Sequence, residues 1–222
     1  QLEEAGFTVI TETVPQENLI SEINEKNYVA ILVRSATKVR KDIIDSCPNL
    51  KLIGRGGVGM DNIDVEYARN KGLHVINTPA ASSQSVAEQV MAHLFGLARS
   101  LYDSNREMPI KGSSEFKSLK KKYAKGIELR GKTLGVIGIG RIGQATIKYA
   151  LGCGMDIIAY DPYMTEATID VEVANQSVSI NIKTSPFDDL LTKSDFITLH
   201  IPAQADGKAV IGNDEFKKMK DG

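Results

Sequence analysis

Cysteine is scarce in this sequence, and the two that are present, Cys47 and Cys153, stand far apart. There is no Cys-x-x-Cys pair and no cysteine and histidine spacing typical of metal ligands. These absences exclude a disulfide scaffold and a structural zinc site. We therefore expect two reduced, buried thiols and no metal centre.

Long apolar runs and an excess of charge of either sign are also lacking. No stretch of about eighteen uncharged apolar residues occurs, and the first residues do not resemble a signal peptide. Lysine and arginine number 27 against 28 acidic residues, so the net charge is -1 and gives no general attraction to nucleic acid. The lysines at 117–125 have too few aromatic neighbours for a nucleic-acid groove. The sequence thus predicts a soluble, cytoplasmic protein without a membrane or nucleic-acid partner.

The sequence does contain short runs rich in valine and isoleucine that alternate with segments of helical period. Its 222 residues, 42% of them hydrophobic, suffice for two domains with their own cores. The alternation predicts the α/β fold class, with two doubly wound parallel sheets of the Rossmann or flavodoxin-like type. No run alternates strictly between apolar and polar residues, so both faces of each strand are expected to be buried. The predicted strands cover residues 7–10, 28–33, 50–53, 73–76, 133–137, 155–160 and 196–199.

The clearest predicted helix covers residues 85–101. Ser85 and Glu88 have the spacing of a capping box. One apolar face follows at spacings of three and four, through Val86, Val90, Leu94, Leu97 and Leu101. The polar stretch 106–131 has no clear period and predicts a domain boundary, so we assign residues 1–104 to one domain and 105–222 to another. Both domains are expected to be incomplete, because each has fewer than the roughly five or six strands usual in such sheets.

A glycine-rich turn follows the predicted strand 133–137. Its glycines are Gly138, Gly140 and Gly143, in the pattern Gly-x-Gly-x-x-Gly between a strand and a helix. The first glycine permits the turn, the second lets a diphosphate approach the backbone, and the third lets the helix pack close to the strand. The diphosphate would then meet free amides at the start of a helix.

An acidic residue ends the next predicted strand. Asp161 comes 18 residues after Gly143, where a carboxylate can accept hydrogen bonds from an adenosine ribose. Because a carboxylate repels a 2′-phosphate, the predicted cofactor is NAD rather than NADP. Two alternatives stay open at this point: the glycines only shape a turn, or the framework binds FAD or S-adenosylmethionine.

Several segments, in order along residues 33–202, carry a likeness to a known family. They read VRSATKV from Val33, LIGRGGVGMDNID from Leu52, VINTP from Val75, LRGKTLGVIG from Leu129 and FITLHIP from Phe196. With these segments the sequence resembles the D-isomer-specific 2-hydroxyacid dehydrogenases, and most of all the members that oxidise 3-phospho-D-glycerate. The resemblance implies a substrate-binding domain at 1–104 and an NAD-binding Rossmann domain at 105–222. It also implies hydride transfer between the substrate carbinol carbon and nicotinamide.

The resemblance implies substrate contacts at the ends of the first domain's strands. Arginines suit a substrate with a carboxylate and a phosphate, because their forked donors pair with both groups. A surface ion pair is the alternative for each arginine, and a simple tight turn is the alternative for the glycines. The expected substrate-binding residues are Arg34, Ser35, Arg55, Gly57 and Val58.

The resemblance likewise extends the cofactor site beyond the glycines. Ile201 stands where phosphoglycerate members often have threonine, and Ser82 where many have asparagine, so backbone contacts carry more of the prediction there than side chains. The expected cofactor-binding residues are Gly138, Gly140, Arg141, Ile142, Gly143, Asp161, Pro162, His200, Ile201 and Pro202.

No catalytic residue is predicted within this chain. In the resembled family the arginine, glutamate and histidine that act on the substrate follow a strand that would start beyond Gly222. The histidines present, His74, His93 and His200, are more simply packed or hydrogen-bonded side chains. We also expect a homodimer, which relatives form through the long helix and the segment after it.

Three functions remain open on this basis. The first is NAD-dependent oxidation of 3-phospho-D-glycerate to 3-phosphohydroxypyruvate, at the start of serine biosynthesis. The second is a dehydrogenase or reductase for glyoxylate, hydroxypyruvate or D-lactate. The third is a non-catalytic NAD-binding module similar to the family's transcriptional corepressors.

Overall fold

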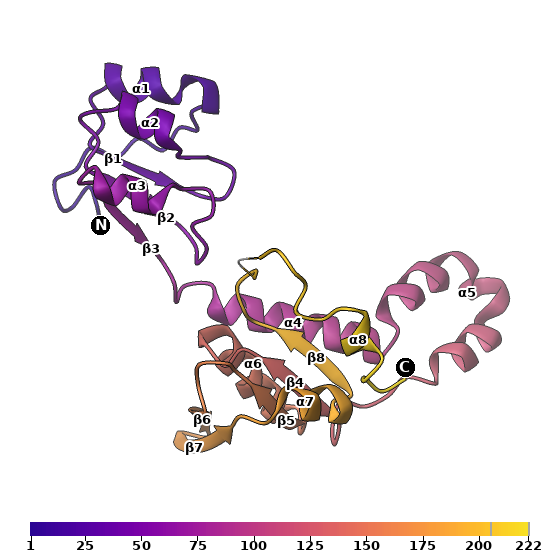
Figure 1. Ribbon diagram of the computed structural model, residues 1–222. Helices are drawn as coiled ribbons and strands as arrows, with labels where there is room; N and C mark the ends of the chain where they lie inside the picture. The colour runs from indigo at the N-terminus through magenta and orange to yellow at the C-terminus, as the bar shows by residue number, and fades with distance from the viewer. Residues whose placement is uncertain (205, 222) are drawn as a thin grey trace. The chain divides into compact units, whose positions relative to one another are not determined.

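The computed structural model describes residues 1–204 and 206–221, and it divides into two compact units, Gln1–Ser82 and Ser83–Gly222 (Figure 1). The first unit contains a parallel three-stranded sheet of order β1-β2-β3. Its strands are β1 (Ala30–Val33), β2 (Leu52–Arg55) and β3 (His74–Asn77), close to three of the predicted ones. The accompanying helices are η1 (Gln16–Asn18), α1 (Leu19–Glu25), α2 (Lys41–Ser46) and α3 (Val65–Asn70).

Two expectations for the first unit are wrong. Residues 7–10 form no strand, and Phe7 and Ile10 are 57% and 50% exposed, so no sheet buries them. The sheet itself is buried on one face only. Ile31, Val33, Ile53 and Val75 belong to the core with the helices, whereas the row Leu32, Gly54 and Ile76 lies on the other face. Leu32 is 66% exposed and Ile76 53%, so an apolar run here does not mean burial on both faces.

The second unit is built on a parallel sheet of order β5-β4-β8. Residues 134 and 136 of β4 (Thr133–Ile137) point to a core shared with α6 (Arg141–Gly152). Ile137 packs with α7 (Phe187–Lys193) instead, and a side chain at Gly135 would collide with Leu190 of that helix. Helices therefore cover both faces of this sheet, as predicted. The flanking strands are β5 (Asp156–Tyr160) and β8 (Phe196–Leu199), and a short helix, α8 (Asn213–Phe216), follows.

An antiparallel hairpin that the sequence analysis missed leads from β5 to α7. It consists of β6 (Glu166–Val173) and β7 (Gln176–Lys183), joined by Ala174 and Asn175, whose positive φ angles of 48° and 65° suit a two-residue hairpin turn. Ala167 and Ile169 are buried against the core that contains α6, while the alternate residues carry polar side chains. The hairpin thus covers the sheet face where a Rossmann crossover usually places a helix.

The long helix after β3 begins earlier and is rotated relative to the prediction. Helix α4 (Ser83–Ala98) starts two residues before the predicted cap at Ser85, and Glu88 accepts a hydrogen bond of 2.9 Å from the Tyr149 hydroxyl on α6. Its buried residues are Ala87, Met91, Leu94 and Ala98, so of the predicted apolar face Leu94 is confirmed, whereas Leu97 and Leu101 are 72% and 52% exposed. Small residues allow α4 to lie close to α6, so α4 belongs to the second unit and the division falls at Ser82, not near residue 104.

The segment expected to be an irregular linker is largely helical. Helix α5 (Leu101–Tyr123) contains Pro109 and a break in helical geometry at Glu115. Leu119 is its only buried residue, which explains why the sequence shows no period here. None of the described helices is long and apolar enough to cross a membrane.

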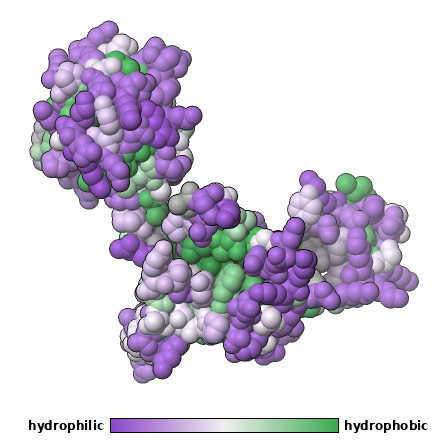
Figure 2. Space-filling model, in the orientation of Figure 1, coloured by the Kyte–Doolittle hydropathy of each residue, from purple (hydrophilic) through white to green (hydrophobic). Residues whose placement is uncertain are grey.

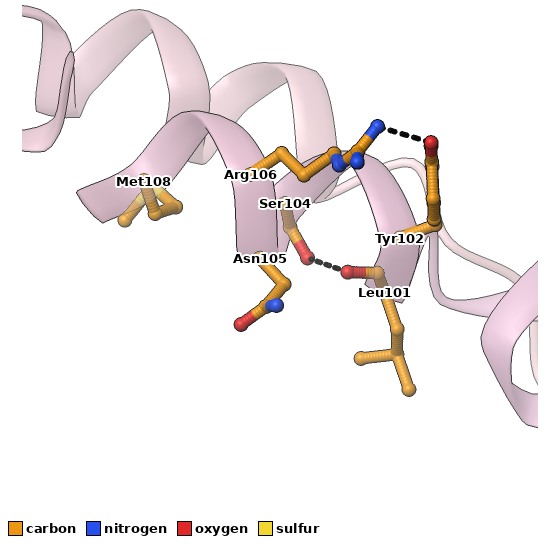
Figure 3. A pocket seen from close by; sticks show the side chains of 6 residues that line it. All are labelled: Leu101, Tyr102, Ser104, Asn105, Arg106 and Met108. Atoms are coloured by element: carbon orange, nitrogen blue, oxygen red, sulfur yellow. Dashed lines mark hydrogen bonds between the residues drawn. The ribbon is translucent and has the colours of Figure 1, made fainter. Parts of the chain in front are cut away.

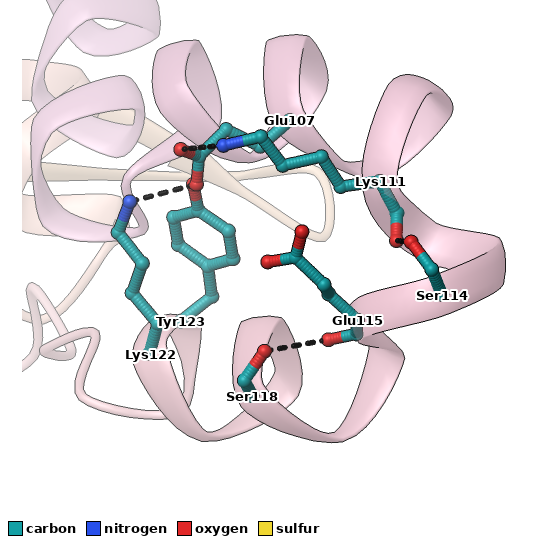
Figure 4. A network of polar contacts seen from close by, with 7 residues as sticks. All are labelled: Glu107, Lys111, Ser114, Glu115, Ser118, Lys122 and Tyr123. Atoms are coloured by element: carbon teal, nitrogen blue, oxygen red, sulfur yellow. Dashed lines mark hydrogen bonds and ion pairs between the residues drawn. The ribbon is translucent and has the colours of Figure 1, made fainter.

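A carboxylate joins the two parts of α5 across this break. Glu107 accepts hydrogen bonds from Lys122 at 2.7 Å and from the Tyr123 hydroxyl, and it pairs with Lys111 at 3.5 Å (Figure 4). The Lys122 ammonium and the Tyr123 hydroxyl lower the pKa of Glu107 to about 2. Since the folded-state pKa lies below the unfolded value, this stabilisation is complete above about pH 4.5 and is lost as the pH falls through about 2.

Glu107→Gln should loosen α5 at neutral pH, because the neutral amide no longer attracts two lysines. We expect tryptic cleavage within residues 117–125 to accelerate by about threefold or more, a rise that corresponds to the modest energy of exposed pairs. Glu115→Gln is the matched control, since its carboxylate makes no hydrogen bond or ion pair with the described residues, and only its backbone carbonyl is engaged, by Ser118. Equal cleavage rates for the two variants would show that Glu107 does not hold α5 together.

Candidate functional site

The strand order of the second unit places a topological switch point at the end of β4. From β4 the chain continues through α6 to β5 on one side, and later returns to β8 on the other side of β4. Connections that leave in opposite directions open a crevice at the carboxyl ends of the two adjacent strands. The predicted cofactor residues of the glycine turn follow β4, and those at 200–202 follow β8, so the structure brings both groups to this edge.

The glycines of the turn are required by close contacts. Gly138 has a φ of +91°, and a side chain there would lie 2.7 Å from the carbonyl oxygen of His200. A side chain at Gly143 would lie 2.0 Å from the carbonyl oxygen of Gly138. At Gly140 no atom lies within 4 Å of the added carbon, so this position faces open space. The first and third glycines therefore allow packing, and the second leaves room for a ligand.

The first turn of α6 offers backbone donors beside that space. Gly140 precedes the helix and provides no side-chain cap, and the first amides of any helix have no partner inside it. Arg141 and Ile142 are the first two residues of α6, as the predicted contacts of their amides require. Free amides, an open glycine and the positive end of a helix fit a diphosphate.

Asp161 lies at the end of β5 and already holds the glycine turn. Its Oδ2 accepts a hydrogen bond of 2.9 Å from the Ile139 amide, and its Oδ1 accepts from the amides of Tyr163 and Met164 at 2.8 and 3.1 Å. The carboxylate is thus directed toward the turn, with lone pairs left for ribose hydroxyls. The Ile139 amide, in contrast, is not free for a diphosphate. Pro162, the next residue, is exposed.

The wall formed after β8 is largely apolar. The His200 amide continues the pairing with β4 by donating to Ile137 at 2.8 Å, and its Nε2 lies 3.3 Å from the Thr146 hydroxyl and 3.1 Å from the Thr198 hydroxyl. Burial lowers the pKa of His200, so the ring is neutral near pH 7 and ties β8 to α6. Ile201 packs against the core beside Gly138, and hydrophobic residues gather over β8 in Figure 2. Pro202 lies exposed beyond them.

The predicted substrate residues of the first unit meet at the carboxyl edge of its own sheet. Val33 pairs with Arg55 in register, so Arg34 and Ser35 follow β1 beside the turn after β2. The Arg55 guanidinium lies over Gly57, and its Nε is buried without a hydrogen-bond partner among the described residues. Both arginines thus occupy one edge of the sheet.

One predicted contact of this turn is already engaged. The Gly57 amide donates to the Thr78 hydroxyl at 2.8 Å, and the Asn77 amide group donates to the Val58 carbonyl at 2.7 Å. The Gly57 amide, expected to face a substrate carboxylate, is therefore not free in this structure. Thr78 and Asn77 were missed as site residues because their partners lie about twenty residues away in sequence.

The remaining histidines and the cysteines form no functional cluster. The Nε2 atom of His93 lies 2.9 Å from the Nε2 atom of Gln89 on α4, and His74 is the first residue of β3. Both cysteines are free thiols; Cys47 is buried, which raises its pKa, and Cys153 is partly exposed. Among the described residues no group of three or more histidine, cysteine or acidic side chains could hold a metal ion.

Asp161→Ala should weaken NADH binding and relax discrimination against NADPH. Hydrogen bonds to a charged group contribute about 1.5–3 kcal/mol, so the dissociation constant of NADH should rise about ten- to a hundredfold. Asp161→Asn keeps an acceptor for the Ile139 amide and should lose less NADH affinity while still gaining NADPH affinity. Fluorescence titrations would measure both, with Asp156→Asn at the opposite end of β5 as control. Unchanged selectivity in both Asp161 variants would place the ribose elsewhere.

Comparisons with known proteins agree with this geometry. D-3-phosphoglycerate dehydrogenase of Methanocaldococcus jannaschii is 42% identical over 219 residues, covering 99% of this chain and 39% of that protein. Hydroxypyruvate reductase of Thermotoga maritima is 42% identical over 214 residues, covering 96% of this chain and 64% of that protein. The chain therefore spans less than two thirds of the length of either relative.

A solved structure and a family model lead to the same family. The NAD+-bound 3-phosphoglycerate dehydrogenase of Entamoeba histolytica has a TM-score of 0.70 at 30% identity, covering 99% of this chain and 61% of that one. The model of the D-isomer specific 2-hydroxyacid dehydrogenase NAD binding domain matches residues 91–222, more than half of the chain. The chain belongs to the D-isomer specific 2-hydroxyacid dehydrogenase family and carries its NAD-binding domain.

Proposed function

We propose that the protein containing this chain oxidises 3-phospho-D-glycerate to 3-phosphohydroxypyruvate with NAD, the reaction that starts serine biosynthesis. The observation that supports this most is the placement of Arg34 and Arg55 at one edge of the first sheet. A substrate with a carboxylate at one end and a phosphate at the other needs cationic donors for both. D-3-phosphoglycerate dehydrogenase of M. jannaschii, 42% identical over nearly the whole chain, is named for this substrate.

The residues of this chain have binding and orienting roles in the proposed reaction. Bound NAD would supply the hydride acceptor. Arg34 and Arg55 would fix the two charged ends of the substrate, while the glycine turn and Asp161 would hold the dinucleotide in the second unit. A base must take the hydroxyl proton as the carbinol carbon is oxidised. We expect that base and its partners outside this sequence, since His74, the histidine of the first unit, begins β3 at the edge of the sheet opposite the candidate substrate residues.

One observation favours a second substrate. Hydroxypyruvate reductase of T. maritima is also 42% identical, and its named substrate lacks a phosphate. An enzyme of that kind would reduce hydroxypyruvate and would gain little from two arginines. A non-catalytic NAD-binding module is the remaining alternative, and it would bind NADH without turnover of any 2-hydroxy acid.

A substrate panel on the full-length protein tests the proposal. We expect NADH production with 3-phospho-D-glycerate to exceed that with D-glycerate, D-lactate or glycolate by about a hundredfold or more in kcat/KM. Arg34→Ala should raise the KM for 3-phospho-D-glycerate at least about tenfold with a smaller change in kcat, because it removes binding rather than chemistry. Arg69→Ala, at the end of α3, is the control. Equal rates for D-glycerate would favour the second substrate, and no turnover would favour the binding module.

We further propose a homodimer that works in the cytoplasm, a location that suits the two free thiols. Helix α5 exposes large apolar side chains, with Ile110 79% exposed and Tyr102 67%. A shallow hollow of about 620 Å³ adds Leu101 and Met108 to this surface (Figure 3). We take this apolar surface as the contact with a second copy of the chain.

Ile110→Glu should shift the protein from dimer to monomer, because it places a charge within the proposed contact. Light scattering after gel filtration would give the mass of each species at matched concentrations. Val178→Glu on the hairpin, where the valine is 49% exposed, is the control and should leave the dimer intact. A wild-type monomer would exclude the proposed assembly.

A further inference from the structure

One side chain outside the predicted site ties the two substrate-facing segments of the first unit together. Asn62 lies between β2 and α3, and it is only 5% exposed. Its backbone carbonyl accepts a hydrogen bond of 2.9 Å from the Val39 amide. Its side-chain Nδ2 donates to the carbonyl of Arg34 at 2.9 Å and to that of Thr37 at 2.6 Å. Asn62 thus contacts both ends of the loop that carries Arg34 and Ser35.

The fold uses the donors of this side chain rather than its acceptor. Both N–H groups of Nδ2 are engaged, whereas Oδ1 is buried and has no hydrogen-bond partner among the residues described. An aspartate could not make these contacts, because an ionised carboxylate has no proton to donate. The position therefore requires a side chain that donates twice from a small planar group.

Apart from Asn62, the loop is fixed by Gln16, whose side chain accepts from the Lys38 amide and donates to the Lys38 carbonyl, both at 2.9 Å. Within residues 1–204 and 206–221, no other hydrogen bond involves Ser35, Ala36 or Thr37. Arg34 and Ser35 are both exposed, so packing does not restrain them either. The direction of the Arg34 side chain depends on the peptide whose carbonyl Asn62 holds, and small misplacements of a binding group weaken binding strongly.

We propose that Asn62 is a positioning residue that aims Arg34 at the substrate by holding the Arg34 and Thr37 carbonyls. The inference rests on the proposed function, because it takes Arg34 as a substrate-binding residue. Asn62 itself touches no substrate. It acts through the loop, and its removal should therefore change substrate binding more than the chemical step.

The test is a double-mutant cycle in the full-length protein. Asn62→Ala should raise the KM for 3-phospho-D-glycerate about tenfold, with kcat within about threefold and the NADH dissociation constant unchanged. In an Arg34→Ala background the same change should raise KM by less than about twofold, because the group that Asn62 positions is already gone. Asn49→Ala is the matched control, since Asn49 donates to Asn27 at 2.9 Å away from this loop. Additive effects, or a lower melting temperature with unchanged KM, would overturn the proposal.

Hydrogen exchange gives a measure that does not depend on turnover. The amides of Lys38 and Val39, which donate to the Gln16 side chain and to the Asn62 carbonyl at 2.9 Å, should exchange about tenfold faster in Asn62→Ala than in wild type or in Asn49→Ala. Asn62→Asp should show the same increase if the lost donors are the cause. Unchanged exchange in both variants would overturn the positioning role of Asn62 but would not contradict the proposed function. A wild-type protein that oxidises no 2-hydroxy acid would instead overturn the proposed function, and the positioning role with it.

Discussion

The carboxyl edge of the β5-β4-β8 sheet carries the expected cofactor-binding residues. Its geometry depends on the close approach of Gly143 to the carbonyl oxygen of Gly138. A side chain at Gly143 would lie 2.0 Å from that oxygen, so any other residue would push α6 away from the end of β4. The contact fixes where α6 begins and directs its first amides into the crevice between β4 and β8. Asp161 adds a second restraint by accepting the Ile139 amide from across the sheet. A diphosphate site of this kind is preorganised by the backbone, and it needs few side chains.

The loops at the carboxyl edge of the first unit's sheet are held in a different way. Among its described residues, no glycine contact directs the first turn of a helix toward the carboxyl edge of the sheet. Hydrogen bonds from side chains hold the loops at this edge instead. Thr78 engages the Gly57 amide, and Asn62 holds two carbonyls of the loop after β1. Such contacts place polar groups with little local backbone constraint, so their geometry is sensitive to single substitutions. The two units thus differ in how firmly the sequence around each site determines its shape.

This difference explains what the sequence could predict. Strands β4 and β8 were located to the residue, because a sheet covered on both faces gives continuous apolar runs. The sequence also predicted that the glycine turn follows β4 and that Asp161 follows β5, because the spacing of these residues reflects backbone geometry. The hairpin β6–β7 was overlooked because half of its side chains are polar and face outward. Glu88 was misassigned to a cap because its partner, Tyr149, lies 61 residues away, and Asn62 has partners 25 and 28 residues distant. No local pattern reports contacts of that kind.

Overall similarity to its relatives does not decide which substrate this chain binds. Two relatives with different named substrates share the same 42% identity with this chain, so overall identity does not separate them. In the proposed function the substrate meets a few side chains, chiefly Arg34 and Arg55, and the loop that carries Arg34 is held by hydrogen bonds from a residue distant in sequence. Selectivity in such a protein can therefore change through a residue like Asn62, which never touches the substrate, while the fold and the cofactor site stay as they are.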